Sequence, residues 1–162
     1  MPSTTRRSVL ASLGAVAVGS IAGCNAVGSA DPPAGSLRFV NDHDLPHAIR
    51  MEVTDVGDAP GDGPAAVTGD PIVPPAQRTL TASTVVDPGE TQTYESVFTE
   101  PVWYAVQFTV DGREPENDAG ITAFHPAPAD GESGSTLTGK VYSSGEFSWV
   151  VGSTENPGPF EG

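Results

Sequence analysis

The fold class of this chain is decided by the stretch Val102-Trp103-Tyr104-Ala105-Val106-Gln107-Phe108-Thr109-Val110. Large apolar side chains occupy every second position of it, beginning at Val102. This period of two is typical of a β-strand with one buried face. We therefore expect Tyr104 to point into a core and Trp103 to lie on the opposite face. That face meets solvent in a two-layer fold, unless a neighbouring Pro-rich loop folds over Trp103 and buries it.

Seven further short runs on either side of this stretch also predict β-strands. They cover residues 37–41, 47–55, 78–86, 91–98, 121–125, 137–142 and 146–152. The segments 42–46 and 143–145 are expected to be hairpin loops, and Asp87-Pro88-Gly89-Glu90 to be a tight turn. Residues 56–76 contain five prolines and predict a long loop with room for one short edge strand. No stretch shows helical periodicity.

About eight short strands at this spacing predict an all-β fold, an antiparallel β-sandwich. The turn at residues 86–90 and the strand at 104–110 resemble the corresponding turn and strand pair of immunoglobulin-like or fibronectin-type sandwiches. The resemblance implies an immunoglobulin-like sandwich, although a cupredoxin-like sandwich would show much the same pattern. Fold alone does not fix function in either case.

The first 24 residues have the composition of an export signal. Arg6 and Arg7 precede an apolar run at residues 9–22, which is followed by Gly23 and Cys24. A run of this length suits a signal peptide and is shorter than the ~20 residues that a membrane-spanning helix needs. We therefore expect the segment to be removed, so that the mature protein begins at Cys24.

Two resemblances support the interpretation of this segment as an export signal. Thr5-Arg6-Arg7-Ser8-Val9-Leu10 resembles the twin-arginine export motif, although it lacks the usual phenylalanine. Ile21-Ala22-Gly23-Cys24 is similar to the lipobox of prokaryotic lipoproteins, which implies lipid attachment at Cys24. Cys24 is also the only cysteine in the chain, so it has no internal disulfide partner. The expected organisation is a signal peptide (1–23), a lipidated flexible tether (24–35), a β-sandwich domain (36–154) and a disordered tail (155–162).

The charge of the chain restricts its partners. All 21 Asp and Glu residues follow Cys24, whereas two of the seven Lys and Arg residues precede it, which gives the mature chain a formal charge of −16. Such an acidic, lysine-poor composition resembles that of proteins from salt-loving archaea, whose multimolar salt screens self-repulsion. A merely acidic secreted protein is the alternative. Nucleic acid and anionic lipid headgroups are poor partners, because both require a basic patch that five scattered cations do not build, and we expect no nucleic-acid binding.

The sequence holds no convincing catalytic or metal motif. A blue copper site requires a Cys thiolate with two His ligands, and the lone Cys24 is assigned to lipid. His47 and Met51 would lie roughly 13 Å apart on a strand, too far to share an ion with His43. We expect these histidines to be loop residues satisfied by solvent, and His125 to be an ordinary strand-end residue. Residues 131–135 miss the nucleophile elbow of serine hydrolases.

The acidic loop around Asp55, Asp58 and Asp62 has spacings that miss the EF-hand calcium pattern, and a solvated loop is favoured there. The sequence therefore predicts no catalytic residue, no metal site and no cofactor. The favoured function is a non-catalytic, surface-anchored β-sandwich that faces outside the cytoplasm and either binds a partner of unknown identity or contributes to the cell envelope. An envelope or membrane protein is the expected kind of partner, with Trp103 as the candidate contact. The alternative is a small metal-handling or redox accessory protein with a cupredoxin-like fold.

Overall fold

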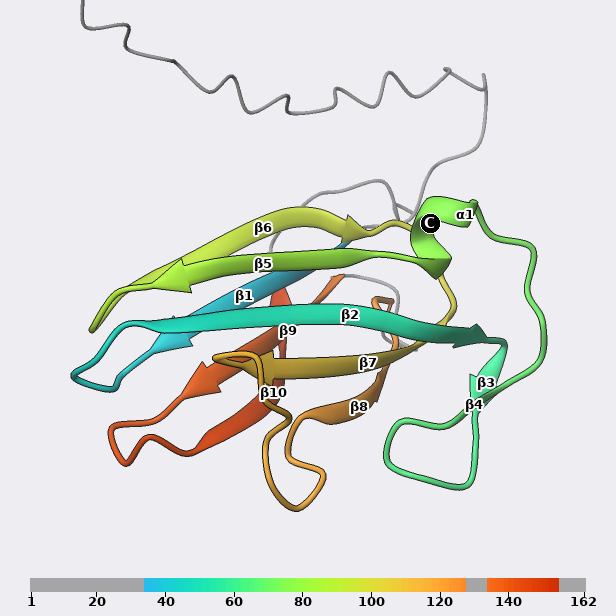
Figure 1. Ribbon diagram of the computed structural model, residues 1–162. Helices are drawn as coiled ribbons and strands as arrows, with labels where there is room; N and C mark the ends of the chain where they lie inside the picture. Colours follow the sequence, from blue (N-terminus) through green and yellow to red (C-terminus); the bar gives the residue numbers. More distant parts are fainter. Residues whose placement is uncertain (1–33, 128–133, 155–162) are drawn as a thin grey trace, which may run out of the picture.

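Eight strands form two four-stranded sheets that face each other in the computed structural model, which describes residues 34–127 and 134–154 (Figure 1). The predicted β-sandwich is therefore confirmed. One sheet has the strand order β10-β9-β1-β6 and the other β5-β2-β7-β8. The strands are β1 (Gly35–Asn41), β2 (His47–Gly57), β5 (Thr81–Val86), β6 (Thr91–Phe98), β7 (Trp103–Val110), β8 (Ile121–Phe124), β9 (Gly134–Val141) and β10 (Phe147–Thr154).

The core lies between the two sheets and is built by alternate residues of each strand, as the period of two predicts. On β7, Tyr104, Val106 and Phe108 are fully buried. On β2, Ile49 and Met51 are fully buried, whereas Arg50 between them is exposed. The other large, fully buried side chains come from every remaining strand except β10 and include Leu37, Phe39, Val86, Phe98, Phe124 and Leu137.

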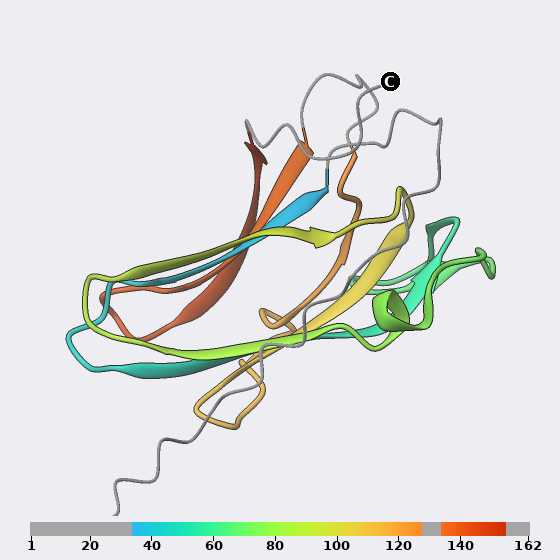
Figure 2. The same ribbon diagram turned by 90° about the horizontal axis from the view of Figure 1, so that it is seen from above.

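The connection between β1 and β2 differs from the predicted hairpin. The two strands lie in opposite sheets, so residues 42–46 cross from one sheet to the other. The tight turn at Gly89, where φ is +73°, likewise joins β5 of one sheet to β6 of the other. Figure 2 shows both crossings at the same end of the molecule. The hairpin predicted at residues 143–145 does join neighbouring antiparallel strands, β9 and β10.

The strand order also differs from that of an immunoglobulin constant domain, in which the first two strands share a sheet. In addition, β1 and β9 pair in parallel, with Leu37 opposite Leu137. All other neighbouring strands are antiparallel. The sandwich is thus predominantly antiparallel, with one parallel pair between strands that are far apart in sequence.

The Pro-rich segment contains more regular structure than expected. Two short strands, β3 (Ala59–Pro60) and β4 (Val67–Thr68), form a small antiparallel pair, and α1 (Pro75–Arg78) is a single helical turn. Prolines at N1 and just before the turn are compatible with a helix start, since proline's missing N–H has no intrahelical partner there. Strand β5 consequently begins at Thr81 and not at the predicted Arg78.

The two ends of the sandwich differ in the chain segments that lie there. At one end, which we term the entry end, the start of β1 and the end of β10 flank the start of β9, because Ser36 and Gly152 are both register partners of Thr136. The opposite end, which we term the loop end, carries four connections: residues 42–46, 87–90, 111–120 and 142–146. The described chain therefore begins and finishes at the entry end.

Candidate functional site

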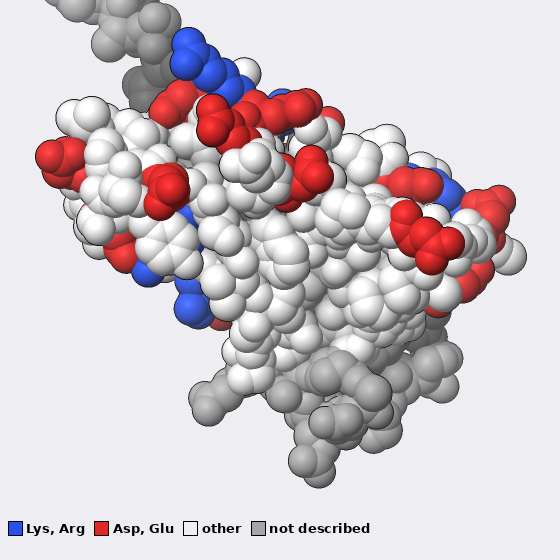
Figure 3. Space-filling model, turned by 90° about the horizontal axis from the view of Figure 1, so that it is seen from below, with Lys and Arg blue, Asp and Glu red and all other residues white. Residues whose placement is uncertain are grey.

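The loop end is strongly acidic and contains a hollow of about 650 Å³. The hollow lies between residues 111–120 and the β9–β10 turn, and its lining includes the carboxylates of Asp111, Glu114, Glu116 and Glu146. Arg113 is the only Lys or Arg in the lining, while Tyr142 and Phe147 contribute aromatic surface. Figure 3 shows the same excess of acidic over basic side chains on the face that it draws. This lining suits a cationic group better than an anionic one.

A chain of polar side chains crosses the loop end beside this hollow. Nδ1 of His43 lies 2.8 Å from Nε2 of His47, and Nδ1 of His47 lies 2.7 Å from Oδ2 of Asp111. On the outer side, Nε2 of His43 lies 3.3 Å from Oδ1 of Asp44. The prediction that these histidines are satisfied by solvent is wrong, because folding brings His47, the first residue of β2, next to Asp111, the first residue after β7.

Asp111 is the residue that holds this chain in place. It adopts φ of +51°, and its backbone N–H donates to the carbonyl of Ala48 at 2.8 Å. Its Oδ1 in turn accepts from the Ala48 N–H at 2.9 Å. Burial opposes the charge of the carboxylate, but the hydrogen bonds from His47 and Ala48 and the nearby Arg113 outweigh it, and the pKa of Asp111 is lowered. Asp111 therefore stays ionised in mildly acidic solution.

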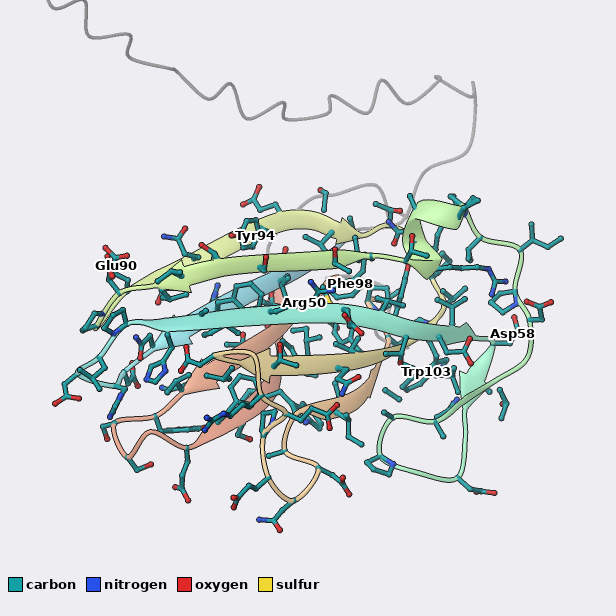
Figure 4. The ribbon with its side chains drawn as sticks, viewed as in Figure 1. Arg50, Asp58, Glu90, Tyr94, Phe98 and Trp103 are labelled. Carbon is teal, nitrogen blue, oxygen red and sulfur yellow. The ribbon has the colours of Figure 1, made fainter. Side chains whose placement is uncertain are left out.

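Trp103 lies at the entry end and is half-buried. Its ring packs against that of His125, with centroids 5.2 Å apart, so His125 has a packing role that the sequence did not predict. Figure 4 places Trp103 and Asp58 toward the same end of the sandwich, with Glu90 at the other. The predicted contact residue is thus far from the acidic hollow.

The outer face of β7 near Trp103 is partly covered and does not meet solvent along its whole length. Ala105, two residues further on, is only 4% exposed. The carbonyl of Pro64 accepts a 3.0 Å hydrogen bond from the N–H of Ala123 on β8, and Thr68 of β4 packs directly against Gly57. Gly57 is the register partner of Trp103. The Pro-rich segment therefore covers part of this face, but Trp103 itself is only half-buried, so its side chain lies between the two expectations.

Within residues 34–127 and 134–154, no group of three or more His, Cys, Asp or Glu side chains is arranged to hold a metal ion. Met51, which shared a sequence pattern with His43 and His47, is fully buried in the core. In the acidic loop, Oδ1 of Asp55 accepts from the N–H of Val56 at 2.8 Å. No described residue of this loop favours the metal-handling alternative.

The predicted export and anchoring residues Arg6, Arg7 and Cys24 lie outside the described residues, as do most of the tether, the tail at 155–162 and most of residues 131–135. In the part of the chain that the structure describes, no helix is both long and apolar enough to cross a membrane. The signal peptide, the anchor and the predicted domain boundaries therefore stay predictions.

The sandwich was compared with known protein families, curated proteins and solved structures. No family model matches the chain, and no curated protein matches it. Among solved structures, the sandwich is similar to the crystal structure of the T6SS lipoprotein TssJ1 from Pseudomonas aeruginosa, with 15% identity and a TM-score of 0.42. The match covers 75% of this chain and 98% of the other. The strand arrangement described above, and not this likeness, defines the fold.

Proposed function

We propose that this protein is a non-catalytic module of the cell envelope, exported by the twin-arginine route and held to the outer side of the membrane by lipid on Cys24. The proposal is supported chiefly by the position of the entry end. Ala34, the first described residue, is fully buried at the start of β1, only ten residues after Cys24. The entry end therefore faces the membrane in the anchored protein, and the loop end faces away from it.

The distance that the tether can bridge supports this orientation. If the tether behaves as the flexible segment that its sequence predicts, its ten residues have a root-mean-square reach of roughly 16–19 Å, too short to let the sandwich turn its loop end freely to the lipid surface. The acidic loops also favour this arrangement, because anionic headgroups repel carboxylates. In this orientation, Trp103 is the proposed contact for an envelope or membrane protein close to the bilayer.

The anchor is tested by replacing Cys24 with Ser in the native host and fractionating cells and medium. A single lipid chain gives only marginal binding, so stable anchoring implies two chains, and their loss should release the domain into the medium or stall its processing. Ser29→Ala, in the same tether, is the matched control and should stay with the membrane. Membrane retention of Cys24→Ser equal to that of the control would refute the lipid anchor.

The export route is tested separately. Replacing Arg6 and Arg7 together with Lys should trap the precursor inside the cell, because the receptor reads the arginine pair itself and not its charge. Export of this variant at the normal level would show that the general secretion route is used, while leaving the anchor intact.

A further inference from the structure

The link between His43 and His47 depends on how many protons the two rings carry. A carboxylate can only accept hydrogen bonds, so Nδ1 of His47 must donate to Oδ2 of Asp111 across the 2.7 Å that separates them. While His47 is neutral, its Nε2 is therefore a lone-pair acceptor, and Nδ1 of His43 donates to it at 2.8 Å. The remaining nitrogen, Nε2 of His43, faces the carboxylate of Asp44.

This chain is complete when the two rings share one positive charge. With three protons on the four ring nitrogens, both carboxylates face an N–H and the two rings are bonded to each other. A fourth proton places N–H groups on both facing nitrogens and brings two like charges together at 2.8 Å. The bond between the rings cannot exist in that state, and charge repulsion replaces it. Imidazoles in general gain their second proton between about pH 5 and pH 8.

Three connections of the loop end meet at this bond. His43 belongs to the crossing at residues 42–46, and Asp111 begins the connection from β7 to β8. The β9–β10 turn packs on the outer side, since a Cβ added at Gly145 would lie 3.6 Å from Nε2 of His43. His47, Asp111 and Gly145 also line the acidic hollow. Breaking the link between the rings thus frees His43 and the wall of the hollow together.

We propose that His43 and His47 form a pH-sensitive latch, which holds the loop end closed near neutral pH and releases it when both rings are protonated. Asp44 lies beside the ring of His43 and Asp111 beside the ring of His47, whereas the two rings face each other directly at 2.8 Å. The elements around the pair carry these further charged groups: Asp42, Asp87, Glu90, Arg113, Glu114, Glu116, Asp118, Lys140 and Glu146. The latch concerns the loop end alone and does not rest on the anchor.

The latch is tested by hydrogen exchange on the full chain in molar salt, which screens the distant charges. After correction for the intrinsic pH dependence, exchange at residues 42–48 and 143–146 should rise about tenfold between pH 8 and pH 5. The amides of β7 should not change. Because the pKa of Asp111 is lowered, its carboxylate keeps its hydrogen bonds to His47 and Ala48 until the solution is more strongly acidic. Protonation of Asp111 therefore does not explain a change near pH 6.

Two variants remove one ring each and so remove the possibility of facing charges. His43→Gln and His47→Gln should both show loop exchange that depends little on pH, with raised exchange already at pH 8. His125→Gln, whose ring packs on Trp103 at the entry end, is the matched control and should keep the full pH response. The latch is wrong if the protein shows no rise between pH 8 and pH 5. It is equally wrong if both single-ring variants respond as the control does.

Discussion

The hydroxyl of Tyr104 donates a 2.8 Å hydrogen bond to Oε1 of Gln77, 27 residues earlier in the chain and inside the sandwich. Oε1 of Gln77 also accepts a 3.1 Å hydrogen bond from the N–H of Thr99, and Nε2 of Gln77 donates to the carbonyl of Val97 at 3.3 Å. Gln77 therefore ties α1 to the end of β6 and to β7. Burial raises the pKa of Tyr104 far above its ordinary value, so this hydroxyl stays protonated in the folded protein.

Truncating Tyr104 should separate the contribution of its ring from that of its hydroxyl. Tyr104→Ala should lower the free energy of unfolding by about 3–5 kcal/mol, because a fully buried ring is lost. Tyr104→Phe should cost about 1–2 kcal/mol, since only the hydrogen bonds disappear. Urea unfolding measures both, with the exposed Tyr142→Phe expected within about 0.5 kcal/mol of the parent. A Tyr104→Ala variant as stable as Tyr142→Phe would place Tyr104 outside the core.

Gly139 should be the glycine of β9 that tolerates no side chain. A Cβ there would lie 2.8 Å from Cε1 of Phe108 and 3.1 Å from Cζ of Phe147, whose rings pack together with centroids 5.3 Å apart. Gly139→Ala should therefore destabilise the fold by about 1–3 kcal/mol through overpacking. Gly152→Ala on β10, where a Cβ meets nothing within 4 Å, is the control and should be neutral or slightly stabilising. Equal midpoints in thermal unfolding would contradict the packing of the two sheets.

Trp103 should behave as a half-buried residue and not as a fully exposed one. In a Trp149→Phe background it is the only tryptophan, and its emission should lie between the buried and exposed extremes with partial quenching by iodide. His125→Ala should shift this emission to the red, because the ring packed against the indole is removed. Trp103→Ala should cost about 1–3 kcal/mol. Emission that is fully quenchable and insensitive to His125→Ala would show that the Pro-rich segment does not cover this face.

Salt should stabilise the protein. The full sequence carries a formal charge of −14, or −16 with processing at Cys24 as proposed; these charges repel one another, and the repulsion is screened as ionic strength rises. We therefore expect the thermal midpoint to increase from about 0.1 M to about 3 M KCl, with most of the early gain from screening. A midpoint that does not change over this range would refute the resemblance to proteins of salt-loving archaea.

Most strands of the sandwich could be predicted from local pattern, because burial of alternate residues produces an alternation of apolar and polar side chains within each strand. The inward direction of Tyr104 on β7 and of Ile49 on β2 follows from the period of two alone. Strand partners could not be predicted in this way. A short polar connection such as residues 42–46 serves equally for a hairpin and for a crossing between sheets, and the parallel pairing of Leu37 with Leu137 joins distant segments.

The same limit applies to the loop end. His43 and His47 are close in sequence, but Asp111 is 64 residues from His47 and is marked only by its place before Gly112 at a strand end. Their meeting follows from the antiparallel pairing of β2 with β7, which places Ile49 opposite Val110. The partial covering of the face near Trp103 could not be predicted from local pattern either, because it depends on where residues 58–72 fold.

The lipid anchor at Cys24 can be tested by the intact mass of the protein extracted from its native membranes. We expect an N-terminus at Cys24, without residues 1–23, and added mass equal to two lipid chains on that residue. A mature protein that begins elsewhere, or one that begins at Cys24 with no added mass, would contradict it.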